Sequence, residues 1–445
     1  MKKLWSAFLA GCLLLSTVPA SAASVEEVRL IIEKNYVDKL SPAFYEATSI
    51  EGMIETLDPY SEYFTKQEYQ QYVQAVDLET VGIGIYLTKH SKGVLITEVI
   101  HDGPADVAGL VPGTVILQAN GTDLANQSID EAASLLQGTA GSFVTLTILT
   151  PDDQITTITL KRQAFSSPHS EMAMLHGNIG YIALYTFSDN ADSLMRQALT
   201  DLRKQGAKSF IVDLRGNGGG YVNVAERIIG MFPNAKTAYV LSNRFHESTH
   251  TAVGTLNKFP QNTRLLIDEY SASASEMTAA ALKDQNSAIL YGAKTYGKGS
   301  MQQFYDFTDG SHLKLTIAKF TGPSKEPING IGVTPHITSK QPLQDAHFDA
   351  LLETGQYDVQ PAVTKDAKSS TLHIMHKQMT INMQDRYVFV KLGTNEAIPF
   401  SAHKSGKSYA RLTLTEQLQA GHTYALITKP TATQKGKIQK IIIEK

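Results

Sequence analysis

The alternation of strand and helix patterns between residues 163 and 345 constrains the fold of this chain most strongly. "SFIVDLRGNGGG" at 209–220 is a buried strand pattern that runs into a glycine-rich loop, and "TRLLIDEY" at 263–270 is a second such strand. "NADSLMRQALTDLRKQG" at 190–206 and "SASEMTAAALKD" at 273–284 have helical apolar spacing. Strands that alternate with helices form βαβ units, so we expect an α/β core on a mainly parallel sheet.

Residues 79–162 have a different pattern of short strands and two helices. "VGIGIYL" at 81–87 and "GVLITEVI" at 93–100 predict strands, and "SIDEAASLLQG" at 128–138 predicts a capped helix. The order of these pieces resembles a PDZ domain. Such a module binds a peptide C-terminus as an added strand, with the carboxylate on backbone N–H groups of the first loop. Here that loop comprises Gly82, Ile83, Gly84 and Ile85.

The remaining segments complete a multidomain α/β chain of 445 residues. Residues 23–78 predict an N-terminal helical segment, 346–362 a linker, and 363–445 a small β module whose function the sequence does not indicate. The net charge of −3 gives no field that would attract nucleic acid or acidic lipid.

The first 22 residues have the pattern of a secretory signal peptide. Two lysines precede an apolar run, and Ala20-Ser21-Ala22 forms a small-residue cleavage site. We therefore expect export across the bacterial cytoplasmic membrane, to the periplasm, the cell envelope or the medium. Cleavage after Ala22 would remove Cys12, the only cysteine, and exclude a cysteine nucleophile or a disulfide. Lipidation of Cys12 in "LAGC" remains an alternative.

"RFHESTH" at 244–250 contains the His-Glu-x-x-His pattern of zinc peptidases. A zinc site of this kind needs His246 and His250 one turn apart on a helix, with Glu247 between them. The surrounding threonines, valines and Gly254 favour a strand and a loop instead. In a strand the two histidines would lie about 13 Å apart, too far to share one metal ion.

Ser273 and Lys298 offer a different chemistry. Ser273 stands where a strand pattern meets a helix that begins near Ala274, a junction that exposes a nucleophile. Lys298 lies between two glycines in "TYGKGSMQQ". Serine needs an adjacent base. A lysine of pKa about 10.4 in water becomes such a base when burial among apolar groups lowers its pKa.

"SASASEM", "YGKGSMQ", "DLRGNGGG" and the PDZ-like segment together resemble the carboxyl-terminal processing peptidases, or tail-specific proteases. The resemblance covers roughly residues 30–345 and includes "TLDPYSEYF" and "INGIGVTPHI". It implies a serine endopeptidase with Ser273 as nucleophile, Lys298 as general base and Gln302 as the residue that orients the lysine. It also implies an oxyanion hole from Gly218 or Gly219 together with Ala274, and supporting roles for Glu276 and Thr295. The chain departs from the family pattern at Asp268-Glu269-Tyr270, where Asn-Glu-Gly is usual.

The sequence thus predicts an exported serine endopeptidase that acts near the C-termini of proteins. The PDZ domain would capture or gate unstructured C-terminal tails. We expect no cofactor, no metal and no nucleic acid partner, and we leave open a homo-oligomer and an envelope-associated partner. The alternatives are a zinc peptidase built on His246, Glu247 and His250, and a non-catalytic PDZ scaffold.

Overall fold

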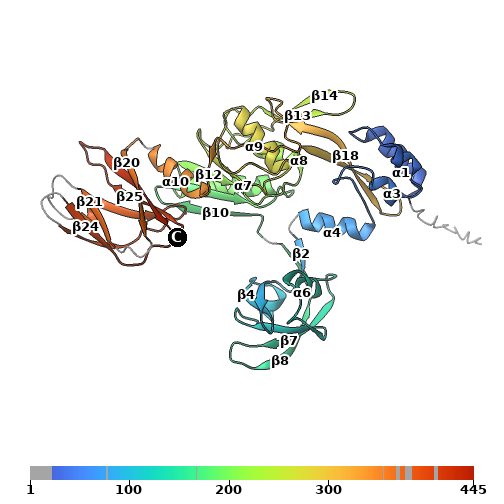
Figure 1. Ribbon diagram of the computed structural model, residues 1–445, viewed down its shortest axis with the longest axis horizontal. Helices are drawn as coiled ribbons and strands as arrows, with labels where there is room; N and C mark the ends of the chain where they lie inside the picture. Colours follow the sequence, from blue (N-terminus) through green and yellow to red (C-terminus); the bar gives the residue numbers. More distant parts are fainter. Residues whose placement is uncertain are drawn as a thin grey trace, which may run out of the picture. The chain divides into compact units, whose positions relative to one another are not determined.

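The computed structural model describes residues 23–76, 79–166, 168–353, 355–366, 371–375, 383–404 and 409–444 (Figure 1). The expected signal peptide, with Cys12, lies outside the described residues. The chain forms two compact units: residues up to Gln71 with Gln302–Ala318, and Tyr72–Met301 with Lys319–Lys445. Within the described part, no helix has the length and apolar character needed to cross a membrane.

The first unit is a small helical assembly with three strands, in which β18 pairs with both β1 and β17. Its first three helices start at serine caps, since the hydroxyls of Ser24, Ser41 and Ser49 accept backbone N–H groups of the first turns. β1 pairs antiparallel with β18, and Lys314 Nζ reaches Glu62 at 3.0 Å. The elements are α1 (Val25–Asn35), α2 (Pro42–Glu46), α3 (Ile50–Ile54), β1 (Glu62–Phe64), α4 (Lys66–Val76), β17 (Ser300–Asp306) and β18 (His312–Thr321).

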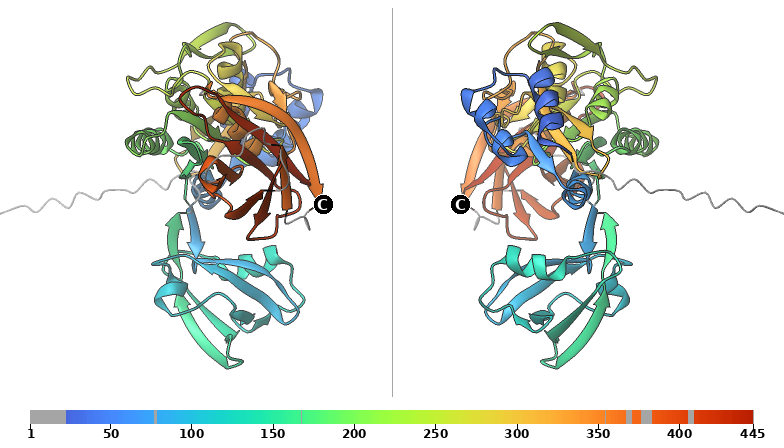
Figure 2. Two further views of the ribbon diagram at one scale, coloured as in Figure 1. Left: turned by 90° about the vertical axis from the view of Figure 1, so that its left-hand side faces the viewer. Right: turned by 90° about the vertical axis from the view of Figure 1, so that its right-hand side faces the viewer.

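The PDZ region of the second unit is an antiparallel sheet with two helices (Figures 1 and 2). Its strand order is β3-β4-β5-β7-β8, so β3 lies at an edge. α6 begins with a capping box between Ser128 and Glu131, as the sequence predicts. The elements are β2 (Glu79–Gly82), β3 (Ile85–His90), β4 (Gly93–Val99), α5 (Pro104–Val107), β5 (Val115–Ala119), β6 (Thr122–Asp123), α6 (Ile129–Leu136), β7 (Phe143–Leu149), β8 (Ile155–Lys161) and β9 (Gln163–Ser166), which pairs with β2.

The α/β core is built on a six-stranded sheet in the order β10-β11-β12-β15-β16-β19. β10 is antiparallel to β11, and every later pair is parallel, which confirms the expected mainly parallel α/β fold. Phe210 and Val212 face α7, α8 and α9, whereas Ile211 faces α10 on the other side. The elements are β10 (Ser170–Leu175), β11 (Ile179–Leu184), α7 (Ala191–Lys204), β12 (Ser209–Asp213), α8 (Val222–Ile229), β13 (Thr237–Ser242), β14 (Glu247–Thr251), β15 (Arg264–Ile267), α9 (Ala274–Asp284), β16 (Ile289–Gly292), β19 (Ile337–Thr338) and α10 (Pro342–Leu352).

The C-terminal residues form a β module of two sheets. The order β20-β26-β25-β22 defines the first sheet and β21-β24-β23 the second. One face of the first sheet packs on α10 and the core sheet, and the other packs on Leu412 and Leu414 of the second. The elements are β20 (Tyr357–Asp366), β21 (Thr371–Met375), α11 (Met383–Arg386), β22 (Tyr387–Lys391), β23 (Phe400–Lys404), β24 (Tyr409–Leu414), β25 (Thr423–Thr428) and β26 (Gly436–Glu444).

The expected linker at 346–362 is ordered structure instead. It carries most of α10 and the start of β20. Ala346, Phe348 and Leu351 are buried between the core sheet and the C-terminal module, which explains why a helix forms there. His347 is also fully buried: Gly393 N–H donates to its Nδ1 at 2.8 Å, and its Nε2 lies 2.8 Å from the carbonyl oxygen of His176.

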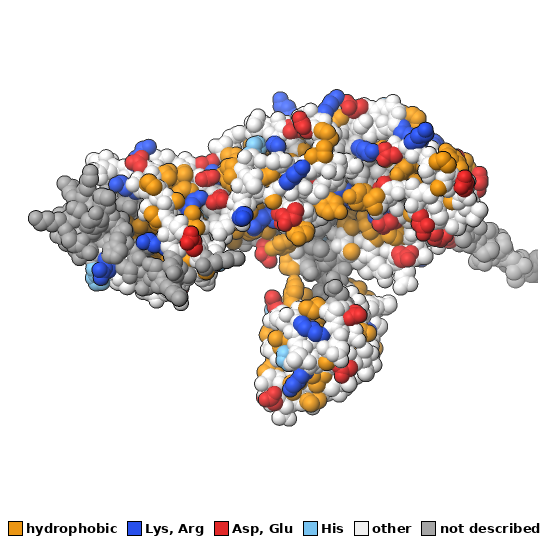
Figure 3. All heavy atoms as spheres, in the orientation of Figure 1, with side chains coloured by type: hydrophobic (Ala, Val, Ile, Leu, Met, Phe, Trp, Pro, Cys, Tyr) orange, Lys and Arg blue, Asp and Glu red, His pale blue; other side chains and the backbone are white. Residues whose placement is uncertain are grey.

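Acidic and basic side chains are interspersed on the visible face of the described residues (Figure 3). This mixture agrees with the small net charge of −3. Exposed large apolar residues include Tyr270, Tyr296 and Ile331, which flank the motifs considered next.

Candidate active site

Ser273 lies at the turn that joins buried strand β15 to helix α9. Its backbone has φ 55° and ψ −111°, a left-handed conformation that a serine adopts only under constraint. The side chain is half-buried, whereas the following residues 274–282 are buried. The turn therefore presents Ser273 at the start of the helix, as expected for a nucleophile at a strand-to-helix turn.

The two flanking serines serve the structure. Ser271 and Ser275 are fully buried. Ser271 Oγ donates to the carbonyl of Leu214 at 2.7 Å, and Ser275 Oγ donates to the carbonyl of Asn217 at 2.9 Å. Both hydroxyls thus tie the nucleophile turn to the loop after β12 and are unavailable for attack.

The glycine-rich loop after β12 packs directly on this turn. Gly219 has φ 108°, and a Cβ there would lie 2.9 Å from Ser273 Cβ and 3.0 Å from the Ala274 nitrogen. Only glycine allows this approach. Gly219 N–H donates to Asn217 Oδ1 at 2.9 Å, whereas Gly218 is exposed with open space around it. The N–H of Gly219 is thus already bonded within the loop, which leaves Gly218 as the candidate of the two for the expected oxyanion hole.

Asp268 is a site residue whose role the sequence reasoning missed. Its Oδ1 accepts Gly216 N–H at 2.9 Å and the N–H groups of Tyr270 and Ser271 at 3.1 Å. One carboxylate thus joins the glycine-rich loop to the nucleophile turn. An aspartate before a run of small residues is a signal for such a turn and could have indicated this role.

The base of the glycine-rich loop is held by Asp213. Arg215 binds both carboxylate oxygens of Asp213, and Tyr181 Oη donates to Oδ2 at 2.8 Å. Burial raises the pKa of Tyr181 above its usual range, and hydrogen bonds to Asp213 raise the pKa of Arg215. The tyrosine is therefore a neutral donor and the arginine a permanent cation at physiological pH.

Glu276, in the first turn of α9, connects the nucleophile turn to the lysine segment. The side chain is fully buried. Its Oε2 accepts Ser273 N–H at 3.0 Å and Lys298 N–H at 2.7 Å, and its Oε1 accepts Gly297 N–H at 2.7 Å and Thr295 Oγ1–H at 2.6 Å. Thr295 Oγ1 also accepts Val333 N–H at 2.6 Å. Both residues expected in supporting positions therefore lie in one hydrogen-bond network.

Lys298 is half-buried and lies between Gly297 and Gly299. The local backbone leaves no room for a larger residue at either glycine. A Cβ on Gly299 would lie 2.4 Å from the Asn329 nitrogen, and Gly297 has φ 101°. Gln302 lies in the first unit, on β17, where its Nε2 donates to Thr316 Oγ1 at 3.2 Å. Thr316 Oγ1 in turn donates to Asp58, the aspartate of "TLDPYSEYF".

The His-Glu-x-x-His stretch does not form a helix. Glu247–Thr251 is strand β14, paired antiparallel with β13, and the residues just before it form the connecting loop, in agreement with the expected strand and loop. His250 stacks on Tyr239, with ring centroids 4.4 Å apart, while His246 is exposed at the preceding turn. Glu247 pairs with Lys325. The helical geometry that a zinc peptidase requires is thus absent from this stretch.

The predicted PDZ loop lies between β2 and β3. Ile83 is 2% exposed and packs in the PDZ core, so its side chain is not available to a peptide. Gly84 has φ 79°, and its carbonyl accepts Ile100 N–H at 2.9 Å. Ile85 starts edge strand β3 and Gly82 ends β2. The loop thus places its backbone beside an edge strand.

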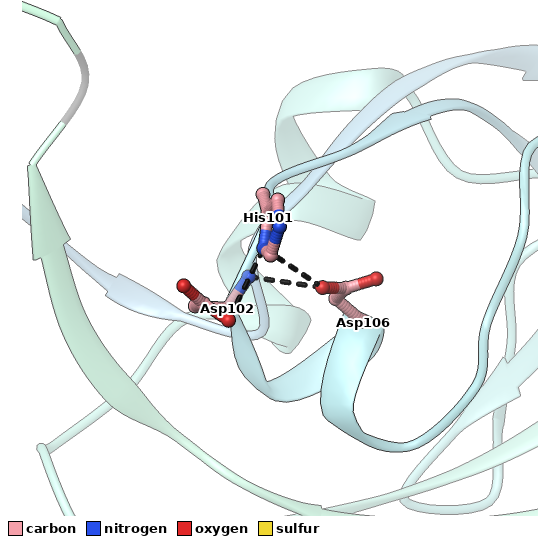
Figure 4. A group of neighbouring side chains, drawn as sticks. All are labelled: His101, Asp102 and Asp106. Atoms are coloured by element: carbon pink, nitrogen blue, oxygen red, sulfur yellow. Dashed lines mark hydrogen bonds and ion pairs between the residues drawn. The ribbon is translucent and has the colours of Figure 1, made fainter.

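Among the described residues, His101, Asp102 and Asp106 form the group that could hold a metal ion (Figure 4). His101 Nδ1 lies 3.1 Å from Asp102 and 3.4 Å from Asp106, and all three side chains are exposed. The group belongs to the PDZ region and has no counterpart at Ser273.

Comparisons with known proteins match both the α/β core and the PDZ region. The sequence model of peptidase family S41 matches residues 178–339, and that of the PDZ domain matches 95–150. A "Probable CtpA-like serine protease" of Staphylococcus epidermidis (strain ATCC 35984) is 32% identical over 327 residues, which cover 73% of this chain and 66% of the relative. The protein of the same name from Staphylococcus aureus (strain bovine RF122) is 32% identical over 330 residues, with the same coverage.

A solved structure from Bacteroides fragilis NCTC 9343, assigned to the S41 proteases, shares the fold. It is 18% identical, with a TM-score of 0.50, and the match covers 75% of this chain and 94% of that one. The chain spans 66% of the length of the curated relatives described above. The resemblance seen in the sequence is confirmed: the chain belongs to peptidase family S41, among the C-terminal processing peptidases, and carries a PDZ domain.

Proposed function

We propose that this chain is a serine endopeptidase that cleaves proteins near their C-termini, with Ser273 as nucleophile and Lys298 as general base. The observation that carries the proposal is the Glu276 carboxylate. A single oxygen of it accepts the N–H groups of both Ser273 and Lys298. The backbones of the nucleophile and the base are therefore neighbours, although 25 positions separate them in the sequence.

The reaction follows from these positions. The neutral Lys298 amine accepts the Ser273 hydroxyl proton as Oγ attacks the scissile carbonyl carbon, and then gives the proton to the departing amine. Water attacks the resulting ester, again with lysine as base, and releases the new C-terminus. The family resemblance assigns the orienting role to Gln302, a neutral side chain that adds no negative charge to stabilise the ammonium form of a lysine. The N–H groups of Gly218 and Ala274 stabilise the oxyanion, and loss of one such donor costs about 3–4 kcal/mol.

The PDZ domain selects the substrate in this proposal. Edge strand β3 can pair with an extended C-terminal peptide, and the loop at Gly82–Ile85 can bind its carboxylate through backbone N–H groups. The signal-peptide pattern at 1–22 supports an activity outside the bacterial cytoplasm. Substrates are thus exported proteins with unstructured C-terminal tails.

The test uses one peptide with a free C-terminal carboxylate and the same peptide amidated. The proposal expects Lys298→Ala to reduce kcat/KM for the free-acid peptide at least 1000-fold, and a chelator to leave the wild-type rate unchanged. It also expects amidation to raise KM at least 10-fold, because the PDZ loop would lose its anion.

Four results would overturn parts of the proposal. Activity abolished by the chelator and restored by zinc would favour the zinc alternative. Full activity in Lys298→Ala would remove the lysine from the mechanism. Equal KM for the two peptides would exclude carboxylate capture, and a wild-type protein that binds both peptides without cleavage would favour the non-catalytic scaffold.

A further inference from the structure

Three large apolar side chains are exposed near the proposed dyad: two on the segments that carry Ser273 and Lys298, and one on the segment that packs on Gly297. Tyr270 is 66% exposed, Tyr296 60% and Ile331 48%. Tyr270 lies three residues before Ser273, and Tyr296 lies two residues before Lys298. The exposed apolar residues thus flank both members of the proposed dyad.

Backbone hydrogen bonds join these segments into one surface. Tyr296 N–H donates to the carbonyl of Ser271 at 3.1 Å, beside Tyr270. Gly330 N–H donates to the carbonyl of Gly297 at 2.8 Å. A Cβ on Gly297 would lie 3.1 Å from the Ile331 nitrogen, so the segment of Ile331 packs closely on that of the lysine. The three side chains therefore emerge from adjacent backbone positions.

Single exposed apolar residues are ordinary, but a group of them at one place marks a surface that binds another molecule. Tyrosine suits such a surface because its ring offers apolar area and only its hydroxyl needs water. We propose that Tyr270, Tyr296 and Ile331 form an apolar subsite that receives a bulky aliphatic or aromatic substrate side chain next to the scissile bond. This inference rests on the proposed function, since the subsite acts only if Ser273 cleaves a peptide.

The test compares two tailed peptides that differ only beside the scissile bond, one with leucine and one with glycine. We expect wild type to prefer the leucine peptide at least 10-fold in kcat/KM. Tyr270→Ala and Tyr296→Ala should each reduce that preference at least 5-fold while the rate on the glycine peptide changes less than 3-fold. Tyr270→Phe should keep the preference, because the ring makes the contact. Phe245→Ala removes a 77% exposed aromatic residue from the β13–β14 hairpin and should change neither rate.

Equal losses on both peptides, or an unchanged preference in both alanine variants, would overturn the subsite. If Tyr296→Ala does not fold, Tyr270→Ala and Ile331→Ala decide the outcome. A change in oligomeric state with unaltered preference would show that the surface binds a second copy instead. Failure of the proposed function is distinguishable, because either the wild type would cleave neither peptide or Ser273→Ala would still cleave both.

Discussion

Glu276→Gln is the most informative single change outside the proposed dyad. The wild-type carboxylate accepts four hydrogen bonds from Ser273, Thr295, Gly297 and Lys298, all between 2.6 and 3.0 Å. Glutamine offers one acceptor oxygen and one NH₂ group. With the NH₂ group at the Oε2 position, the N–H groups of Ser273 and Lys298 both face a donor. With the NH₂ group at the Oε1 position, Gly297 N–H faces a donor, whereas the Thr295 hydroxyl can turn to accept. Each hydrogen bond to a charged group contributes about 1.5–3 kcal/mol, so the loss is about 1.5–6 kcal/mol.

The lost hydrogen bonds should lower the stability of the protein and also displace Ser273 relative to Lys298. We expect kcat/KM on a tailed peptide to fall at least 100-fold and the free energy of unfolding in urea to fall by about 1.5 kcal/mol or more. Glu269→Gln removes the same charge from an exposed position beside the turn and serves as the control. If Glu276→Gln kept kcat/KM within 3-fold of wild type and the free energy of unfolding within about 0.5 kcal/mol, the proposed role of Glu276 in connecting the Ser273 and Lys298 segments would be refuted.

Two further predictions concern backbone space and pH. Gly219→Ala should reduce kcat/KM at least 100-fold, because the new Cβ would lie 2.9 Å from Ser273 Cβ. Gly254→Ala serves as the control and should be neutral, because a Cβ there meets open space. Equal activity of the two variants would contradict the packing argument. Burial lowers the pKa of His347 from 6.5 to about 4, so the unfolded state binds more protons and stability falls as pH decreases through this window. Urea unfolding between pH 6.5 and 5 should therefore show a loss of about 1–2 kcal/mol from this group, which His347→Gln abolishes; an identical pH dependence in the variant would contradict the assignment.

Much of the fold follows from local pattern. β12 and β15 are continuous apolar runs because parallel strands are covered on both faces, and such runs are visible in the sequence. The PDZ region was predictable from the order of its strands and helices. The linker at 346–362 was not, because the burial of α10 depends on the C-terminal module and leaves little local signal.

The candidate site was likewise predictable from the sequence only in part. Ser273 and Lys298 were found from their motifs, as a serine at a strand-to-helix turn and a lysine between glycines. Glu276 and Asp268 connect segments that are far apart in the chain. No spacing rule indicates which N–H groups will donate hydrogen bonds to such a carboxylate. The His-Glu-x-x-His match illustrates the opposite case: the motif is present in the sequence, but the stretch forms a strand and lacks the helical geometry that a zinc site needs.

The most direct test of the central claim compares two neighbouring serines. Ser273→Ala should reduce kcat/KM on a tailed peptide at least 1000-fold without changing the unfolding transition. Ser271→Ala removes a buried hydroxyl that bonds Leu214, so it should lower stability but keep measurable cleavage. Cleavage by Ser273→Ala at the wild-type rate, or loss of activity only in a well-folded Ser271→Ala, would contradict the assignment of Ser273 as the nucleophile.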